Sequence, residues 1–382
     1  MRHRARLRRS WLTIHRSLGL CAGLLVVGMG LTGSLLVFDH AIDEWLNPDL
    51  LLTDGQGPRI EPDRARDAIV ATAPEGHYLS WLSAPRTAQG VYRGYTGPRG
   101  DGFWRSVSVD PVSGEVLGSR RLGDNLMSAV YELHYRLLVG ALGETIVGFI
   151  GLAALLSLCT GLYLWWPRLR HLEPAFTIKR RAASARRQFD LHRTTAIYSL
   201  PVIGIIVVTG IFLAWTAWLA PVVDRVAPLT DPAAEVAVER ADARERIGPS
   251  RAIATAREVL PHAQWSGIGL PATDSNAYRV AFAEPAHPRA STGRSYVWVH
   301  PWSGDVLAVR RWSELSAGDK FLDWQIPLHN GEAFGLTGRI VVFVAGFVPL
   351  ILFITGFRIW RLKRRAASRN PHRRGGTANE RE

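Results

Sequence analysis

The chain has 382 residues, is 47% hydrophobic and carries a formal net charge of +13. Its basic residues lie beside long apolar runs, so the charge indicates membrane topology and needs no nucleic-acid partner. The two cysteines, Cys21 and Cys159, both fall inside apolar runs, which excludes a disulfide framework, a cysteine zinc site and a CxxCH haem-attachment motif.

Four apolar runs are each long enough to cross a bilayer core of about 30 Å as a helix. They are predicted at Leu18–Phe38, Thr145–Trp166, Thr195–Trp218 and Ile340–Trp360. The alternative for the first run is a cleaved signal peptide. Its apolar core is too long for one, and no small-x-small cleavage site follows before Asp39.

The segments between the runs differ in charge. Residues 1–17 hold six Arg and no acidic residue, residues 167–194 hold eight basic and two acidic residues, and the end of the chain from Arg358 holds nine and two. The long segments 39–133 and 220–328 instead hold nine basic against fourteen acidic, and twelve against thirteen. The positive-inside rule therefore predicts cytoplasmic termini and two extracytoplasmic segments.

This orientation divides the chain into eight parts. In order they are a basic N-terminus with the first span at 1–38, an extracytoplasmic domain at 39–133, the second span at 134–166, a basic cytoplasmic loop at 167–194, the third span at 195–219, a second extracytoplasmic domain at 220–328, the fourth span at 329–360 and a basic tail at 361–382. The chain is thus predicted to be a multi-pass membrane protein with cytoplasmic termini.

Histidines and Thr-Gly pairs recur at fixed spacing. The distance from histidine to threonine is 17 residues for the first and third spans and 26 residues for the second and fourth. The matched residues are His15 with Thr32, His134 with Thr160, His192 with Thr209 and His329 with Thr355. The spacing predicts a tandem two-span repeat, with a pseudo-twofold axis along the membrane normal.

The two long segments also resemble each other. Asp110–Leu117 and His300–Leu307 each place Ser-Gly-acid at a turn between alternating apolar residues, which predicts a β-hairpin. Arg64–Ala73 and Ser250–Leu260 have the periodicity of short amphipathic helices. Each segment is therefore predicted to be a small α+β domain.

Topology sorts the four repeated histidines into two facing pairs. His15 and His192 are predicted at the cytoplasmic end, and His134 and His329 at the outer end. Two imidazoles facing each other across a helix bundle are the arrangement that ligates the iron of haem b. The alternatives are zinc or copper at the same pairs, or interfacial histidines without a ligand. His40 is a candidate for a spare outer ligand.

Charged and aromatic residues near the span ends suggest further roles. Arg16 and Arg193 directly follow the inner histidines and are placed to reach haem propionates. Glu144 and Arg339 share one repeat position and are candidates for an ion pair across the pseudo-axis. Because the two histidine pairs are expected to lie far apart, bridging aromatics are also candidates: Trp165, Trp215 and Trp360.

These motifs resemble the PepSY-associated transmembrane helix family, over nearly the whole chain. The matching motifs are Ile14–Gly19 with Thr32-Gly33, Leu328–Arg339, and Thr355-Gly356 followed by Trp360. The long segments look like PepSY domains. One departure is that His134-Tyr135-Arg136 lacks the glycine of His329-Asn330-Gly331.

Members of that family are often associated with iron uptake in Gram-negative bacteria, and some are inner-membrane di-haem ferric-siderophore reductases. The resemblance implies an oxidoreductase with two haem b groups held by His15, His192, His134 and His329. Its substrate would be a ferric siderophore or another ferric chelate, and its electron donor a separate protein or a quinol. The alternative is a non-enzymatic membrane anchor whose PepSY-like domains bind a peptide or protein partner. A transporter is disfavoured because the spans carry no ionisable residue at mid-membrane.

Overall fold

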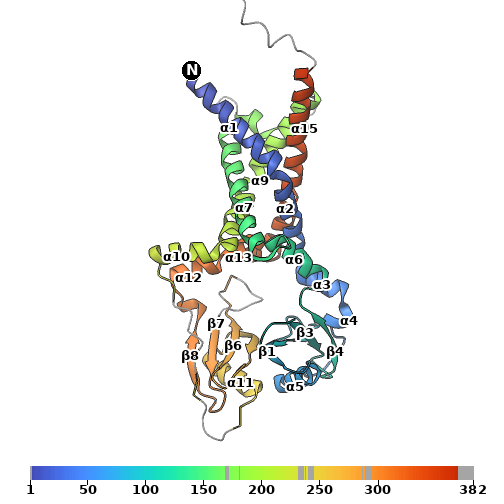
Figure 1. Ribbon diagram of the computed structural model, residues 1–382, viewed down its shortest axis with the longest axis vertical. Coiled ribbons are helices and arrows are strands. Elements are labelled where there is room, and N and C mark those ends of the chain that lie inside the picture. The colour runs from blue at the N-terminus through green and yellow to red at the C-terminus, as the bar shows by residue number, and fades with distance from the viewer. Residues whose placement is uncertain are drawn as a thin grey trace, which may run out of the picture. The chain divides into compact units, whose positions relative to one another are not determined.

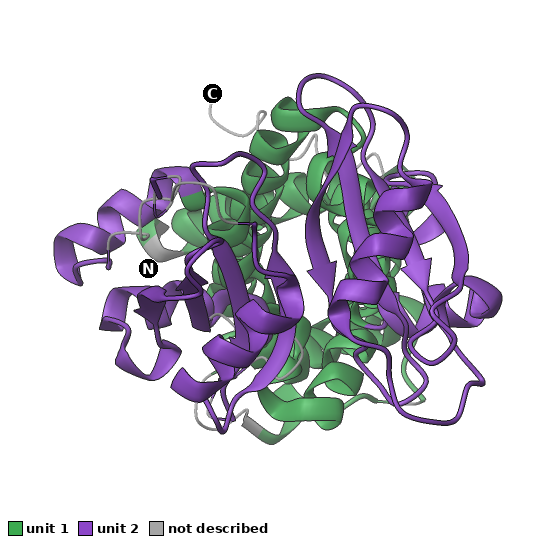
Figure 2. Ribbon diagram, turned by 90° about the horizontal axis from the view of Figure 1, so that it is seen from below, with its two compact units in different colours: residues 1–37, 131–216, 328–382 green, residues 38–130, 217–327 purple. Residues whose placement is uncertain are grey.

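In the computed structural model, residues 2–167, 172–179, 181–230, 236, 238–239, 245–285, 287–288 and 295–368 are described. Residues 168–171 and 180 of the basic loop, and residues 369–382 of the tail, therefore lie outside the described residues. The chain forms two compact units (Figure 2). Unit 1 comprises residues 1–37, 131–216 and 328–382, and unit 2 comprises residues 38–130 and 217–327.

Unit 1 is a helix bundle (Figure 1). Its long helices are α1 (Arg2–Cys21), α2 (Gly23–Val37), α7 (Gly140–Trp165), α9 (Ser184–Ala214), α14 (Gly335–Ala345) and α15 (Val348–Ser368). The short helix α8 (Leu172–Phe176) lies between α7 and α9, and the 3-10 turn η3 (Glu332–Phe334) precedes α14. Three helices join the two units: α6 (Leu126–Arg136), α10 (Thr216–Val226) and α13 (Gln325–Asn330).

Within the described chain, three helices are long and apolar enough to cross a membrane: Gly140–Trp165, Ser184–Ala214 and Glu332–Ala366. A fourth span exists if α1 and α2, which are bent by 56° at Ala22, are counted as one. The predicted count of four thus depends on that bent pair. The chain is a membrane-integral protein with a separate sheet-containing unit.

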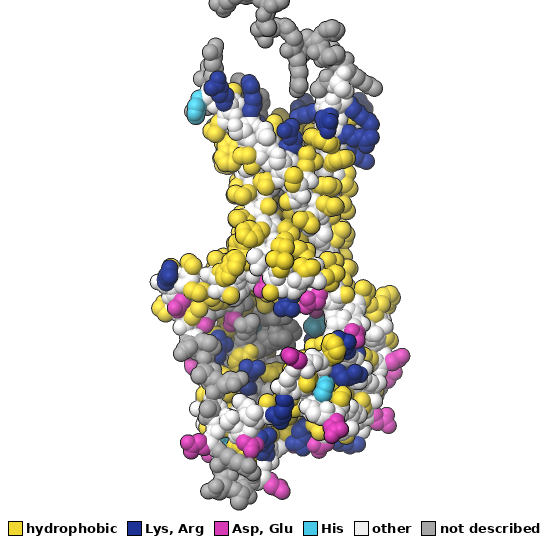
Figure 3. All heavy atoms as spheres, in the orientation of Figure 1, with side chains coloured by type: hydrophobic (Ala, Val, Ile, Leu, Met, Phe, Trp, Pro, Cys, Tyr) yellow, Lys and Arg dark blue, Asp and Glu magenta, His cyan; other side chains and the backbone are white. Residues whose placement is uncertain are grey.

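Side chains on the bundle surface agree with this assignment. On the face seen in Figure 3, hydrophobic side chains cover the helices of unit 1, and Lys and Arg gather where α1 begins and α15 ends. Exposed apolar residues are tolerated there because lipid, not water, surrounds a membrane span. Residues such as Leu24, Leu142 and Phe149 are all more than half exposed.

Glycines bring the helices of the bundle close together. A Cβ atom on Gly30 of α2 would collide with the backbone oxygen of Gly346, and one on Gly346 would collide with Ser34. Ser34 also donates a hydrogen bond of 2.8 Å to the carbonyl of Phe343. Small residues at a membrane helix interface allow this close approach, and an interhelical hydrogen bond adds to it.

Unit 2 contains one eight-stranded antiparallel sheet with the order β4-β3-β2-β1-β5-β6-β7-β8. Its strands are β1 (His77–Ser83), β2 (Tyr92–Pro98), β3 (Arg105–Val109), β4 (Val116–Arg121), β5 (Gln264–Gly269), β6 (Tyr278–Ala283), β7 (Ser295–Val299) and β8 (Val306–Arg310). The predicted hairpins correspond to β3–β4 and β7–β8. The expectation of two separate α+β domains did not include the pairing of β1 with β5, which joins the strands of both long segments into one sheet.

Two helices cover one face of this sheet: α5 (Pro62–Thr72) and α11 (Pro249–Val259), both of which match predicted amphipathic helices. Each begins with proline, whose fixed φ suits the first helical turn. Ile69 and Ile253 pack into the same core as Val107, Ile268 and Phe282. Burial of these side chains is the main stabilising term for the sheet.

Short helices complete unit 2: α3 (Asp39–Leu46), α4 (Pro48–Leu51), η2 (Trp312–Glu314) and α12 (Ala317–Asp323). Asp43 of α3 accepts a hydrogen bond of 2.8 Å from Nη1 of Arg120 on β4, and a second from Nη2. Burial pushes the pKa of Asp43 upward, but the Arg120 guanidinium outweighs burial and holds that pKa below its usual value. This bidentate ion pair links α3 to β4 of the sheet.

Candidate functional site

The four histidines singled out by the sequence lie in two pairs in unit 1. His15 of α1 faces His192 of α9, with ring centroids 6.2 Å apart and ring planes at 83°. His134 of α6 faces His329 of α13, with the same centroid distance and an interplanar angle of 60°. The spare ligand candidate, His40, lies in α3, which belongs to unit 2.

Each histidine is held by a threonine on another helix. The Nδ1 nitrogen lies 2.9–3.0 Å from a threonine Oγ1 in all four cases. The partners are His15 with Thr160, His134 with Thr32, His192 with Thr355 and His329 with Thr209. A facing helix therefore fixes the orientation of each imidazole ring.

The partners of these contacts indicate which ring nitrogen carries the proton. Each threonine hydroxyl donates its hydrogen to the carbonyl four residues earlier in its own helix, at 2.7–2.8 Å. It can therefore only accept from the histidine. Nδ1 of His15 also lies 3.1 Å from the carbonyl oxygen of Ser157, which is an acceptor only. His192 and His329 have equivalent carbonyl contacts, with Leu352 and Ile206.

The Nδ1–H tautomer leaves the Nε2 lone pair of each ring available. No residue in the described part of the chain makes a hydrogen bond with the Nε2 atom of any of the four histidines. Metal-ligating histidines commonly donate their second ring N–H to a fixed acceptor in this way. Nε2 of each ring thus has no hydrogen-bond partner in the described part of the chain.

A glycine lies beside each ring. A Cβ atom built on Gly33, Gly161 or Gly210 would lie 3.0–3.1 Å from the Cε1 atom of the neighbouring histidine, and one on Gly356 would lie 3.4 Å away. Each glycine directly follows the threonine that holds that histidine. The Thr-Gly pair therefore provides both the hydrogen-bond acceptor and the space for the ring.

Tight turns place His134 and His329 just before their spans. After His134, Leu137 and Leu138 adopt φ values of 50° and 60°, which are rare for a bulky residue. After His329, Gly331 takes φ 83° at no such cost. The missing glycine noted in the sequence is therefore replaced by two strained leucines, which points to a constrained site.

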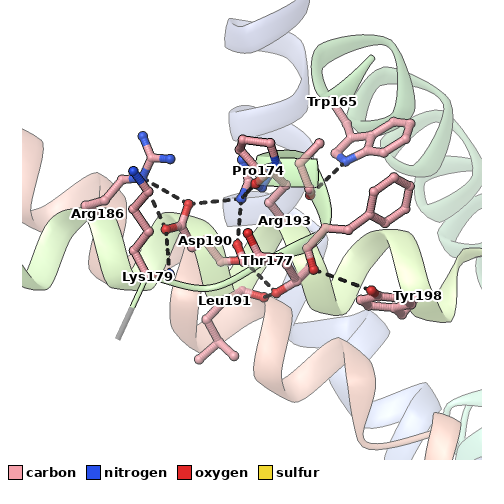
Figure 4. A network of polar contacts seen from close by, with 12 residues as sticks. Trp165, Pro174, Thr177, Lys179, Arg186, Asp190, Leu191, Arg193 and Tyr198 are labelled. Carbon is pink, nitrogen blue, oxygen red and sulfur yellow. Dashed lines mark hydrogen bonds and ion pairs between the residues drawn. The ribbon is translucent and has the colours of Figure 1, made fainter. Parts of the chain in front are cut away.

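Arg16 and Arg193, which follow the inner histidines, differ in the partners of their side chains. Nη2 of Arg193 lies 3.1 Å from Oδ1 of the fully buried Asp190, and it donates to the carbonyls of Pro174 and Thr177 at 2.6 and 2.9 Å (Figure 4). Nη2 of Arg193 is therefore used within the protein, whereas its shielded Nε has no hydrogen-bond partner. Arg16 is exposed and has no side-chain partner in the described residues.

The expected ion pair between Glu144 and Arg339 does not form. Glu144 accepts a hydrogen bond of 2.9 Å from Tyr135 and lies 3.7 Å from Arg136. Arg339 donates to the carbonyl of Val37, at the end of α2, with a Nε distance of 3.2 Å. Glu144 thus pairs with residues of α6, and Arg339 binds the last carbonyl of α2.

The tryptophans proposed as bridges do not lie between the two histidine pairs. Trp165 and Trp360 each lie five residues beyond the threonines that hold His15 and His192, on the side away from the other pair. Trp215 likewise follows Thr209 at the far end of α9. Its indole donates to the carbonyl of Thr145 at 3.3 Å, which ties α9 to α7.

The recurring threonines are visible in the sequence, but their role as partners of the histidines is not. The only available signal was their constant spacing, which is the same in matched spans. Each threonine bonds a histidine from a different span or preceding helix, so spacing along one chain could not show which residues meet.

A search of curated proteins finds no match. The profile described as the PepSY-associated TM region matches residues 12–363, which include all four histidines and their threonines. The chain therefore belongs to the PepSY-associated TM family.

Proposed function

We propose that the protein is an inner-membrane electron-transfer protein with two haem b groups that reduces a ferric siderophore or a related ferric chelate. His15 and His192 hold the haem nearer the cytoplasm, and His134 and His329 hold the one nearer the periplasm. In this proposal unit 2 consists of the two PepSY-like halves of a tandem repeat and lies in the periplasm. Family membership supports the membrane and PepSY parts of this proposal.

The observation that carries the proposal is the Nδ1–threonine contact that all four histidines share. Each Nδ1–H is used by a threonine on a facing helix, so each Nε2 is free to coordinate. A single interfacial histidine needs no such arrangement. Four rings prepared in the same way, in two facing pairs, favour ligation over structural roles.

The pair geometry fits haem better than zinc or copper. A metal–imidazole bond is about 2.0 Å, so rings on opposite sides of one ion have centres about 6 Å apart. The observed distance is 6.2 Å in both pairs. In the described residues no third His, Cys, Asp or Glu joins either pair. Tetrahedral zinc needs four ligands, whereas haem brings four nitrogens of its own and needs two axial ligands.

When bound, haem supplies one-electron redox chemistry, which the side chains of the chain lack. The residues of the chain orient the axial ligands, exclude water and set the distance between the sites. On the single helix α9, His192 belongs to one pair and Thr209 holds the other. These residues are 17 apart, which corresponds to roughly 26 Å along a helix at about 1.5 Å per residue.

Reduction of iron gives a chemical reason for chelate release. Hard oxygen donors bind Fe(III) much more tightly than Fe(II), since the smaller and more highly charged ion is the harder acid. One electron accepted by the ferric ion therefore weakens the chelate without breaking any bond within it. The product is the ferrous ion and the intact iron-free chelator.

The test is a reduced-minus-oxidised optical spectrum and a pyridine haemochrome assay on the purified protein in detergent. We expect a low-spin b-type spectrum and about two haems per chain. His15→Ala and His329→Ala should each remove one haem, whereas His262→Ala in unit 2 should remove none. A folded protein that remains colourless after reconstitution with haem would overturn the proposal.

A second candidate function is partner binding without electron transfer. The strand β8 lies at one edge of the sheet, and its side chains Val306, Leu307 and Val309 are exposed. An exposed edge strand can accept an extended peptide as an additional strand. In that case haem-free protein would bind the partner as well as haem-loaded protein, and Val309→Lys would weaken the binding.

A further inference from the structure

Gln188 is a buried side chain that the histidine pairs do not explain. It lies in α9, is 8% exposed, and its shielded Oε1 atom has no hydrogen-bond partner. The other shielded polar atoms in the described part of unit 1 belong to charged residues that have partners: Arg136, Asp190, Arg193 and Glu332. An unpaired buried amide is costly and calls for an explanation.

The position of Gln188 relates it to the inner histidine pair. It precedes His192 by four residues, so the two side chains lie on the same face of α9. Helical side chains lean toward the N-terminus, which tilts His192 toward the turn that carries Gln188. On α1, Trp11 has the same offset from His15. An amide and an indole thus border this pair on the side away from His134 and His329.

Charged residues close to Gln188 in the sequence of α9 are engaged with one another. Asp190 and Arg193 are bound to each other, and Arg193 also bonds the carbonyls of Pro174 and Thr177 (Figure 4). Arg186 completes this network, with its Nε 3.0 Å from Asp190. The unpaired atom of Gln188 is an acceptor, so a matching ligand must donate an O–H or N–H group.

Aromatic residues also lie at this end of the apolar spans. The ring of Trp11 is 6.0 Å from that of Tyr163, which follows Thr160 and Gly161 on α7. A ligand that enters from the bilayer, stacks on aromatic rings and donates a hydroxyl is an aromatic diol. We propose that Gln188 accepts a hydrogen bond from a hydroxyl of a membrane quinol, bound beside the His15–His192 pair as the electron donor. This inference rests on the proposed function.

The electrons and protons of the proposed quinol oxidation balance as follows. A quinol loses two electrons and its two hydroxyl protons and becomes the quinone. The two electrons reduce two ferric ions, one in each of two chelates, to ferrous ions. The amide of Gln188 is too weak a base to take a proton, so it only orients the hydroxyl and the protons pass to water.

Binding is tested with heptyl-hydroxyquinoline N-oxide, a quinol analogue that gives up no electrons, by equilibrium dialysis against the full-length protein in detergent. Gln188→Leu removes the acceptor and should weaken binding about tenfold, the effect of one hydrogen bond. Gln188→Glu keeps an acceptor oxygen and should bind within about threefold of the unmodified protein. Arg187→Leu, an exposed neighbour, is the control and should change nothing.

A second measurement keeps the test valid if the Leu variant does not fold. An azido-quinone photolabel on the unmodified protein should label peptides of α1, α7 or α9, and labelling confined to other helices would overturn the proposal. Unchanged analogue binding in Gln188→Leu would also overturn it. So would loss of haem from both Gln188 variants with analogue binding intact, because that result assigns the amide to the haem carboxylates. A haem-free protein that still binds the analogue through Gln188 would keep the quinol site and overturn the proposed function alone.

Discussion

Thr160 of α7 and His15 of α1 are joined by a hydrogen bond of 3.0 Å between Oγ1 and Nδ1, across 145 residues of sequence. The same hydroxyl donates to the carbonyl of Leu156 at 2.8 Å. One threonine therefore anchors itself to its own helix and accepts from a histidine of another. Three further threonines do the same, which makes this contact the repeated unit of the site.

The first prediction concerns this hydroxyl. Thr160→Val preserves the shape of the side chain but removes the acceptor for His15, which then keeps only the carbonyl of Ser157. Loss of such a supporting contact typically weakens metal binding by about 10–100-fold. We expect one of the two haems to be lost selectively on dilution, measured by haemochrome assay and optical titration.

The matched control for this change is Thr216→Val. Thr216 also donates to the carbonyl four residues earlier, that of Phe212 at 2.7 Å, but it contacts no histidine. Both haems should remain after this substitution. Equal haem loss in the two variants would show that a general helix effect, and not ring orientation, is responsible.

The second prediction concerns the space beside the ring. In Gly210→Ala the new Cβ would lie 3.0 Å from Cε1 of His329, which is tighter than ordinary contact, so the ring must move. We expect haem binding at the His134–His329 pair to fall while the other pair is retained. Gly204→Ala on the same helix meets no atom within 4 Å, and alanine there should leave haem content unchanged or stabilise the helix.

Much of this site could be predicted from the sequence. The spacing of His15 to Thr32 and of His192 to Thr209 singled out the histidines. Apolar length and charge asymmetry, which are local properties of the sequence, placed them at span ends. The partners of the rings could not be predicted. His192 bonds Thr355, which lies 163 residues away, and only the packing of α9 against α15 brings them together.

In the sheet, likewise, local structure could be predicted and the pairing of distant strands could not. Turn residues and alternating apolar positions predicted the hairpins, since Asp110 accepts from the backbone N–H groups of Val112 and Ser113 at 2.7 and 2.9 Å. The pairing of β1 with β5 was not predicted. It rests on three opposed residue pairs, including Leu82 with Ile268, and no local pattern specifies which edge strands will meet.

The third prediction concerns the connection between the second and third spans. In Arg193→Lys a single ammonium replaces the planar fork that reaches Asp190 and the carbonyls of Pro174 and Thr177. We expect faster amide hydrogen exchange in residues 172–179, by about tenfold or more, with the spans unaffected. Arg187→Lys changes an exposed arginine on the same helix and should leave exchange unaltered; equal exchange in both variants would contradict this role for Arg193.

The fourth prediction concerns acid stability of unit 2. Because the Arg120 guanidinium holds the pKa of Asp43 below its usual value, the pair stabilises the fold above the unfolded-state pKa of about 3.9 and loses this contribution as pH falls further. Asp43→Asn removes one charge of a buried pair and leaves Arg120 uncompensated, so we expect a loss of about 3 kcal/mol at neutral pH. The measurement is denaturant unfolding of the full-length protein, followed by tryptophan fluorescence, from pH 7 to about pH 3. The difference in the free energy of unfolding between Asp43→Asn and the unmodified protein should stay constant to about pH 4 and shrink below it.

Asp67→Asn, which breaks an exposed pair with Arg66, is the control and should cost less than about 1 kcal/mol. A difference for Asp43→Asn that grows as pH falls would show that the carboxylate is destabilising, and it would contradict the direction of the pKa shift.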